Sequence, residues 1–179
     1  MTANEPHGLV WDAPSLAGPD TISLRSTDFD DNGLIPSVHA AVRAGGENLS
    51  PALAWTTPTG AVQLLLIIED PDASTRTPYL HCLALLDASM PGLDRGALSP
   101  PVATGVQFAR SAAGYGYLGP APRKSHGPHR YVFQLFAIET PLDVGAKPDA
   151  LTPAALTKRL IHNARVIARG RVTGLYQRT

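Results

Sequence analysis

The sequence predicts a mainly β fold, and three observations support this class. The 179 residues include 17 prolines and 16 glycines, which suits a chain of strands joined by many turns. Three apolar runs, 62–69, 79–86 and 131–138, have the composition of strands that are buried on both faces. Only the segment 152–163 has a clear helical pattern. We therefore expect one mainly β domain with a single late helix.

The first third of the chain is expected to form a lead-in followed by short strands. Residues 1–20 are polar and contain prolines, so we expect an extended segment that Trp11 anchors. A single domain should then occupy 21–179, because no repeat or linker divides the rest of the chain. Alternating polarity and turn-forming residues predict strands at 21–29 and 34–42, a turn at 30–33, and shorter strand pieces within 48–55.

The three apolar runs should form the centre of the sheet. The first ends directly in Asp70-Pro71-Asp72, which places two carboxylates at a strand end. The second carries His81 near its start. The third follows a loop of glycines and prolines that begins at Gly114. A further short strand is expected within 105–110.

The end of the chain should form a helix and then a closing strand. Thr152 is a suitable N-cap and Pro153 suits the first helical position. Three apolar residues then share one helical face, and the helix should end near Asn163. They are Leu156, Leu160 and Ile161. Alternation over 165–178 predicts the closing strand.

The composition excludes several classes of protein. The formal net charge is zero and no basic cluster is visible, which argues against a nucleic-acid partner. The single cysteine, Cys82, cannot form an intramolecular disulfide and favours a reducing compartment. The N-terminus lacks the pattern of a signal peptide, and the longest apolar run, 64–68, is too short to span a membrane. We therefore expect a cytoplasmic protein with no membrane span.

Polar side chains from several elements can converge if the three apolar strands are neighbours. Histidines beside a carboxylate can carry a proton near neutral pH. Glycine-rich turns present backbone N–H groups that favour anions such as phosphate. The residues therefore predict a small anion pocket. Its candidate members are Asp70, Asp72, His81, Gly119, Pro120, His129 and Tyr131.

Simpler roles compete for some of these residues. Asp72 also suits a turn, and a histidine within an apolar strand, such as His81, is most often a packed core residue. The pair His126 and His129 resembles half of a zinc site, but no second pair has ligand spacing, so no metal is expected. A hydrolytic triad of Asp70, His129 and Ser125 lacks a nucleophile elbow.

Ordered motifs in this chain resemble those of the phosphatidylethanolamine-binding protein family. The resemblance extends over about residues 21–178 and, within the family, points to the bacterial Raf-kinase-inhibitor-like branch of the YbhB/YbcL type. The ordered set that includes GPHRY is specific, whereas DPDA alone is a weak signal. The motifs are IPSVHAAVRAGGENLSPALAW at 35–55, DPDAS at 70–74, His81 at the head of an apolar strand, GYLGPAPRKSHGPHRYVFQLFA at 116–137 and the final GLYQR.

The resemblance implies a β-sandwich of two antiparallel sheets with a C-terminal helix and a closing strand. It also implies a surface pocket for phosphate or a phospholipid head group. We expect His81 and His129 to donate to the phosphoryl oxygens there. The matching positions are Asp70, His81, Gly119, Pro120, His129 and Tyr131. It implies binding without catalysis and without a cofactor, modulation of a kinase or protease partner, and a homodimer.

The sequence departs from the family pattern at the pocket. Ser74 replaces a proline that commonly follows a cis bond, and a cis bond before serine costs about 3 kcal/mol, so we expect a trans bond. Arg123 and Lys124 add two cations near the pocket, which favours an anionic ligand.

Two other functions compete with binding at this pocket. The first is hydrolysis of a phosphate or ester, with Asp70, His81 and His129 as acid and base. The second is a pure interaction module whose altered pocket is vestigial.

Overall fold

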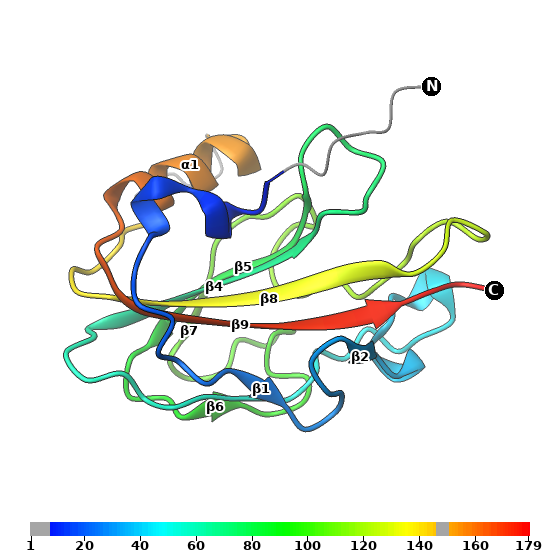
Figure 1. The fold of residues 1–179 in the computed structure, drawn as a ribbon, viewed down its shortest axis with the longest axis horizontal. Helices are drawn as coiled ribbons and strands as arrows, with labels where there is room; N and C mark the ends of the chain where they lie inside the picture. The colour runs from blue at the N-terminus through cyan, green and yellow to red at the C-terminus, as the bar shows by residue number, and fades with distance from the viewer. Residues whose placement is uncertain (1–7, 146–150) are drawn as a thin grey trace.

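The computed structural model describes residues 8–145 and 151–179, and its centre is a six-stranded sheet in the order β2-β9-β8-β4-β5-β7. A smaller sheet, β1-β3-β6, lies against one face of the large sheet (Figure 1). The strands are β1 (Arg25–Ser26), β2 (Gly33–Leu34), β3 (Leu53–Ala54), β4 (Gln63–Asp70), β5 (Tyr79–Asp87), β6 (Gly92–Leu93), β7 (Val106–Phe108), β8 (His129–Ile138) and β9 (Val166–Tyr176). The helical elements are the 3-10 turns η1 (Val10–Asp12), η2 (Pro14–Leu16), η3 (Ser37–His39) and η4 (Val42–Ala44), and the helix α1 (Pro153–Asn163).

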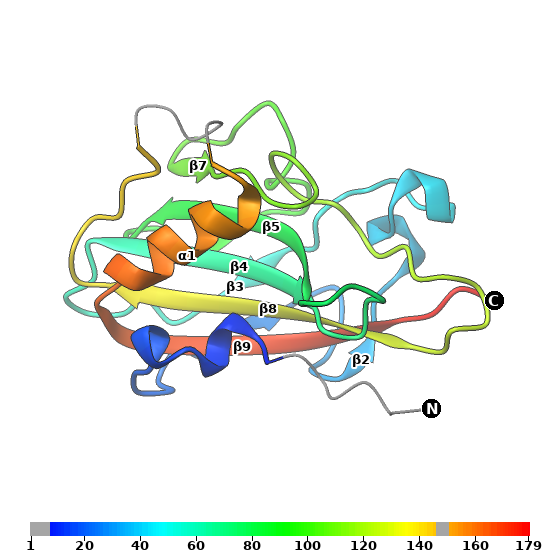
Figure 2. The same cartoon turned by 90° about the horizontal axis from the view of Figure 1, so that it is seen from above.

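The large sheet is buried on both faces, as the apolar runs predict. Successive residues of a strand point to opposite faces, so one run of β4 supplies two cores. Leu64, Leu66 and Ile68 pack towards the small sheet. Leu65 and Ile67 pack against a third layer that contains η1, η2 and α1 (Figure 2).

The predicted fold class is confirmed, with one difference in strand direction. The strands of the large sheet pair antiparallel except for β2, which pairs parallel with β9. The pair is short because only Gly33 and Leu34 take part. Backbone bonds from Asn32 to the Thr173 carbonyl and from Ile35 to the Leu175 carbonyl hold the segment along the edge.

The C-terminal elements match the sequence pattern. The Thr152 side chain accepts a hydrogen bond from the Ala155 N–H at 3.2 Å, which caps α1. The helix ends at Asn163, and the predicted closing strand is β9. The short strand expected within 105–110 is β7.

The N-terminal segment folds onto the sheet instead of running extended. Trp11 lies in η1, is 8% exposed, and packs beside Phe136 with ring centroids 5.7 Å apart. The Arg169 guanidinium lies 4.0 Å from the centre of the Trp11 ring, which anchors the segment to β9. Residues 1–7 lie outside the described range. The division of the chain at residue 20 stays a prediction.

Two of the predicted early strands are wrong over most of their length. The range 34–42 contains two residues of β2 and then the 3-10 turns η3 and η4, and 21–29 contributes only the two residues of β1. Pro36 offers no N–H to a sheet, and Gly45 closes η4 in the left-handed conformation at φ +88°. The 3-10 turns bury three consecutive residues, His39, Ala40 and Ala41, where a strand would alternate.

Within the described part of the chain, α1 has 11 residues, and no helix is long and apolar enough to cross a membrane.

Candidate functional site

A cavity of about 360 Å³ lies at one end of the large sheet, on the face towards the small sheet. The loop after β4 and the loop before β8 reach this end, beside η4 (Figure 1). The cavity is therefore built where three buried strands begin or end. Its lining residues are Arg43, Asp70, Ala73, Ser74, Thr75, Tyr79, His81, Ala121, Pro122, Arg123, His126, His129 and Tyr131.

Three side chains in this cavity form a hydrogen-bonded chain. His129 Nδ1 lies 2.8 Å from Asp70 Oδ2, and both residues are buried. His129 Nε2 lies 2.7 Å from Nδ1 of His126, which is exposed on the loop before β8. The sheet brings Asp70 and His129 together because β4 and β8 pair antiparallel.

The proton positions in this chain follow from its geometry. The Asp70 carboxylate accepts, so His129 Nδ1 carries a hydrogen. With both rings neutral, His126 Nδ1 donates to His129 Nε2, and the second nitrogen of His126 keeps a lone pair.

His81 reaches the same cavity through a β-bulge in β5. Ile68 pairs with Cys82, and the next residue, Glu69, pairs with Leu80, so His81 is the extra residue. Strict alternation from Cys82 would point His81 to the other face of the sheet. The bulge instead places its ring edge-on to Tyr131, with centroids 5.1 Å apart.

The environment of His81 favours its neutral form. Its Nδ1 lies 2.6 Å from the Leu118 carbonyl oxygen, so Nδ1 carries the hydrogen. Burial lowers the pKa of His81 below its ordinary value, although the Leu118 carbonyl and Asp70 oppose this effect. The remaining nitrogen, Nε2, therefore offers a lone pair and accepts hydrogen bonds.

Tyr131 lines the inner wall and stays neutral. It is 2% exposed, and burial raises the pKa of its hydroxyl well above the ordinary value, with the Asp70 charge adding to the effect.

Two arginines make the cavity attractive to anions. Arg43, from η4, and Arg123, from the loop before β8, both line it and are exposed. Lys124 is also exposed but is absent from the lining. Of the two added cations that the sequence analysis singled out, Arg123 alone lines the cavity.

Asp72, a predicted ligand-binding residue, lies outside the cavity. Its carboxylate accepts from Arg130 Nε at 2.9 Å and Nη2 at 2.7 Å, and also from the Arg130 backbone N–H at 2.8 Å. This bidentate pair lowers the pKa of Asp72, against the opposing effect of its partial burial. Asp72 therefore fixes the start of β8.

Gly119 and Pro120 support the loop from behind the cavity wall. The Gly119 N–H donates to the Asn48 side-chain oxygen at 2.7 Å, and the Pro120 carbonyl accepts from Ala41 at 3.0 Å. A side chain at Gly119 would meet backbone atoms of Ala40 and Ala41 within 3.0 Å. The neighbouring residues Ala121 and Pro122 line the cavity instead.

The bond before Ser74 is trans, as the serine led us to expect. Pro100–Pro101 is the one cis bond among the described residues.

No sequence pattern indicates that Arg43 belongs to the cavity. The spacing of His126 and His129 is the one sequence signal for His126, and this spacing resembles half of a metal site. In the described part of the chain, no group of three or more His, Cys, Asp or Glu residues is arranged to hold a metal ion.

Comparisons with known proteins identify the family of this chain. The family model described as "Phosphatidylethanolamine-binding protein" matches residues 25–177. A UPF0098 protein of Methanothermobacter thermautotrophicus is 33% identical over 166 residues, covering 88% of this chain and 99% of that protein. A UPF0098 protein of Aquifex aeolicus is 30% identical over 168 residues, covering 90% and 92%.

A solved structure supports the same assignment. Escherichia coli YbcL, described as a member of the mammalian PEBP family, matches with a TM-score of 0.76 and 25% identity, over 87% of this chain and 98% of that one. The match agrees with the branch that the motifs indicated. The chain belongs to the phosphatidylethanolamine-binding protein family.

Proposed function

We propose that the cavity binds a phosphate-type anion, such as the phosphoryl group of a phospholipid head group, without transforming it. The observation that carries this proposal is the Asp70–His129–His126 chain, which opens into a cavity that Arg43 and Arg123 also line. Membership of the family supports ligand binding in general.

Each polar group has a distinct part in this binding. The two arginines donate to phosphoryl oxygens. The Asp70–His129–His126 chain places two imidazole rings at the cavity, and the Asp70 carboxylate holds His129 in position. His81 accepts a hydrogen bond, so it fits a singly protonated phosphoryl group that offers a P–OH. This role replaces the donor role that we expected for His81 from the sequence.

The arrangement favours binding over hydrolysis. A hydrolase that forms a covalent intermediate would pair the histidine base with a side-chain nucleophile. In the part of the chain that the structure describes, His129 Nε2 instead contacts His126, and no serine or threonine hydroxyl is within hydrogen-bond distance of either nitrogen. Modulation of a kinase or protease, and a homodimer, stay predictions of the resemblance.

Calorimetric titration with phosphoethanolamine near pH 6.5 tests the proposal. The variants Arg123→Gln and Lys124→Gln remove the same charge from adjacent residues, of which only Arg123 lines the cavity. We expect about tenfold weaker binding for Arg123→Gln and for His129→Ala, and less than about twofold for Lys124→Gln. Equal binding by all three variants would overturn the assignment. Turnover of chromogenic phosphate esters that His129→Ala abolishes would favour the hydrolase.

A further inference from the structure

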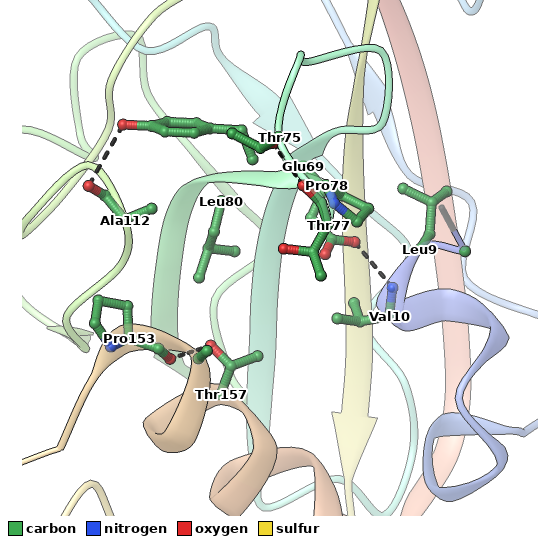
Figure 3. A pocket seen from close by; sticks show the side chains of 13 residues that line it. Leu9, Val10, Glu69, Thr75, Thr77, Pro78, Leu80, Ala112, Pro153 and Thr157 are labelled. Atoms are coloured by element: carbon green, nitrogen blue, oxygen red, sulfur yellow. Dashed lines mark hydrogen bonds between the residues drawn. The ribbon is translucent and has the colours of Figure 1, made fainter. Parts of the chain in front are cut away.

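A second cavity, of about 420 Å³, lies on the opposite face of the large sheet at the same end. Figure 3 shows that it is enclosed by the start of η1, the loop between β4 and β5, Ala112 and the first turn of α1. Glu69 and Leu80 form its floor. Its volume lies within the range of small-molecule sites, about 300 to 1,000 Å³. Neither Glu69 nor Leu80 lines the anion cavity described above.

The second cavity has apolar walls and one charged group. Its apolar wall residues are Leu9, Val10, Pro78, Leu80, Ala112, Pro153 and Ala154. Among the described residues that line it, Glu69 is the one acidic residue, and no lysine, arginine or histidine is present. Its electrostatic character is thus opposite to that of the anion cavity.

One oxygen of Glu69 has partners and the other has none. The side chain is buried, at 5% exposure. Oε2 accepts from the Val10 N–H at 3.0 Å and from Gln134 Nε2 at 2.8 Å. Gln134 in turn accepts from the Trp11 N–H at 3.0 Å. These bonds connect η1 to the sheet, and they account for the hydrogen-bonding capacity of Oε2. No described residue donates to Oε1, although the residue lines the cavity.

No lysine, arginine or histidine among the described residues that line the cavity pairs with Glu69. Burial raises the pKa of Glu69, and the charge of Asp12 adds to the rise, while the bonds from Gln134 and Val10 oppose it. Because Oε1 stays accessible from the cavity, an ammonium group that reaches it adds a charge-assisted hydrogen bond.

The N-terminus of α1, which borders this cavity, is not the group that would bind the charged end of a ligand. Pro153, at the first position of α1, has no N–H group, and Thr152 already accepts from the Ala155 N–H. The first turn of α1 therefore contributes mainly apolar surface, including Ala154.

We propose that this second cavity binds a primary amine with a short hydrocarbon body. The ammonium group donates to Glu69 Oε1, and the hydrocarbon body occupies the apolar walls next to Leu80 and Pro153. The site is separate from the anion cavity, although Thr75 and Tyr79 line both. Neither site depends on the other for its charged groups.

The test is an NMR titration of the ¹⁵N-labelled protein with n-hexylammonium, 1-hexanol and hexanoate. Hexylammonium should shift the amide signals of Val10, Leu80 and Thr157 with a Kd on the order of 1 mM. Hexanol should bind about tenfold more weakly, and hexanoate should not bind. Equal binding of the alcohol and the amine would contradict the role of Glu69. The absence of saturable shifts with hexylammonium would contradict the site.

Three variants test whether hexylammonium binds to Glu69 in the second cavity. Glu69→Gln keeps an acceptor for the Val10 N–H and removes the charge, so it should weaken hexylammonium about tenfold. Ala154→Leu fills the cavity without touching Glu69 and should abolish binding. Ala155→Leu, on the adjacent exposed residue outside the cavity, is its matched control and should leave binding unchanged. If Glu69→Gln does not fold, the Ala154 and Ala155 variants decide, and equal binding by both would overturn the proposal.

A failure of the anion site is distinguishable from a failure of this one. The His129→Ala variant should bind phosphate about tenfold more weakly and bind hexylammonium as the parent protein does.

Discussion

Asp70 and His129 are 59 residues apart in the chain, and their side chains meet at 2.8 Å beneath the anion cavity. The contact fixes which nitrogen of His129 carries hydrogen and leaves the other towards His126. The buried Asp70 carboxylate also fixes the orientation of the His129 ring at the cavity wall. The pair therefore connects the packing of β4 and β8 with the chemistry of the cavity.

Asp70→Asn should weaken phosphoethanolamine binding by about tenfold, because an amide can donate as well as accept and no longer fixes the hydrogen on His129 Nδ1. Calorimetry measures the change. Asp72→Asn is the matched control, since the Asp72 carboxylate is engaged by Arg130 outside the cavity. We expect it to change affinity by less than about twofold, because the ion pair is partly exposed and contributes little. An equal loss in both variants would mean that Asp70 has no special role.

His81 should make the free protein less stable in mild acid. Burial lowers the pKa of His81 in the folded state below 6.5, so the unfolded chain binds its proton first. The contribution is fully present above pH 6.5 and is lost as the pH falls through the lowered folded value. The lowered pKa values of Asp28 and Asp72 act only below 3.8, outside this window.

Urea unfolding at pH 7.5 and 5.5 measures this effect. The parent protein should lose more of its free energy of unfolding between these values than His81→Gln does, because glutamine does not titrate. If both proteins lose the same free energy of unfolding between the two pH values, His81 is not held neutral by burial.

Arg169→Lys should lower the free energy of unfolding by about 1–3 kcal/mol, because lysine cannot replace the planar guanidinium. This group stacks on Trp11 and donates to the Trp11 and Leu16 carbonyl oxygens, at 2.9 and 3.2 Å. Arg171 also lies over Trp11, at 4.8 Å from the ring centre, but makes no such carbonyl bonds. Chemical denaturation should therefore detect a smaller loss of unfolding free energy for Arg171→Lys than for Arg169→Lys.

Gly119→Ala should destabilise the protein by about 1–3 kcal/mol, because the added carbon would overlap the backbone at Ala40 and Ala41. Gly8→Ala is a control, since its nearest new neighbour lies 3.6 Å away on the Asp12 side chain. Differential scanning calorimetry compares the two variants. A Gly119→Ala protein as stable as the parent would mean that the loop before β8 does not need the close approach.

The buried centre of the fold is predictable from the sequence because it depends on composition. The apolar runs of β4, β5 and β8 exceed what one buried face requires, so burial on both sides follows directly. The cap of α1 is a local signal and is equally visible. The range 34–42 misleads because its sequence alternates in polarity, whereas the 3-10 turns that it forms bury three consecutive residues, 39–41.

The cavity is only partly predictable, for a different reason. Asp70 and His129 follow from their places at strand ends. The orientation of His81 depends on a bulge that alternation alone does not reveal. Arg43 comes from a turn 27 residues before Asp70, and nothing in its local sequence indicates that η4 approaches the cavity.

Crystals soaked in inorganic phosphate would test the central claim most directly. We predict anion density within hydrogen-bond distance of Arg123 and of the His126–His129 pair, with His81 Nε2 facing a phosphoryl oxygen. An empty cavity at saturating phosphate, or density confined to surface residues such as Lys124, would contradict the account.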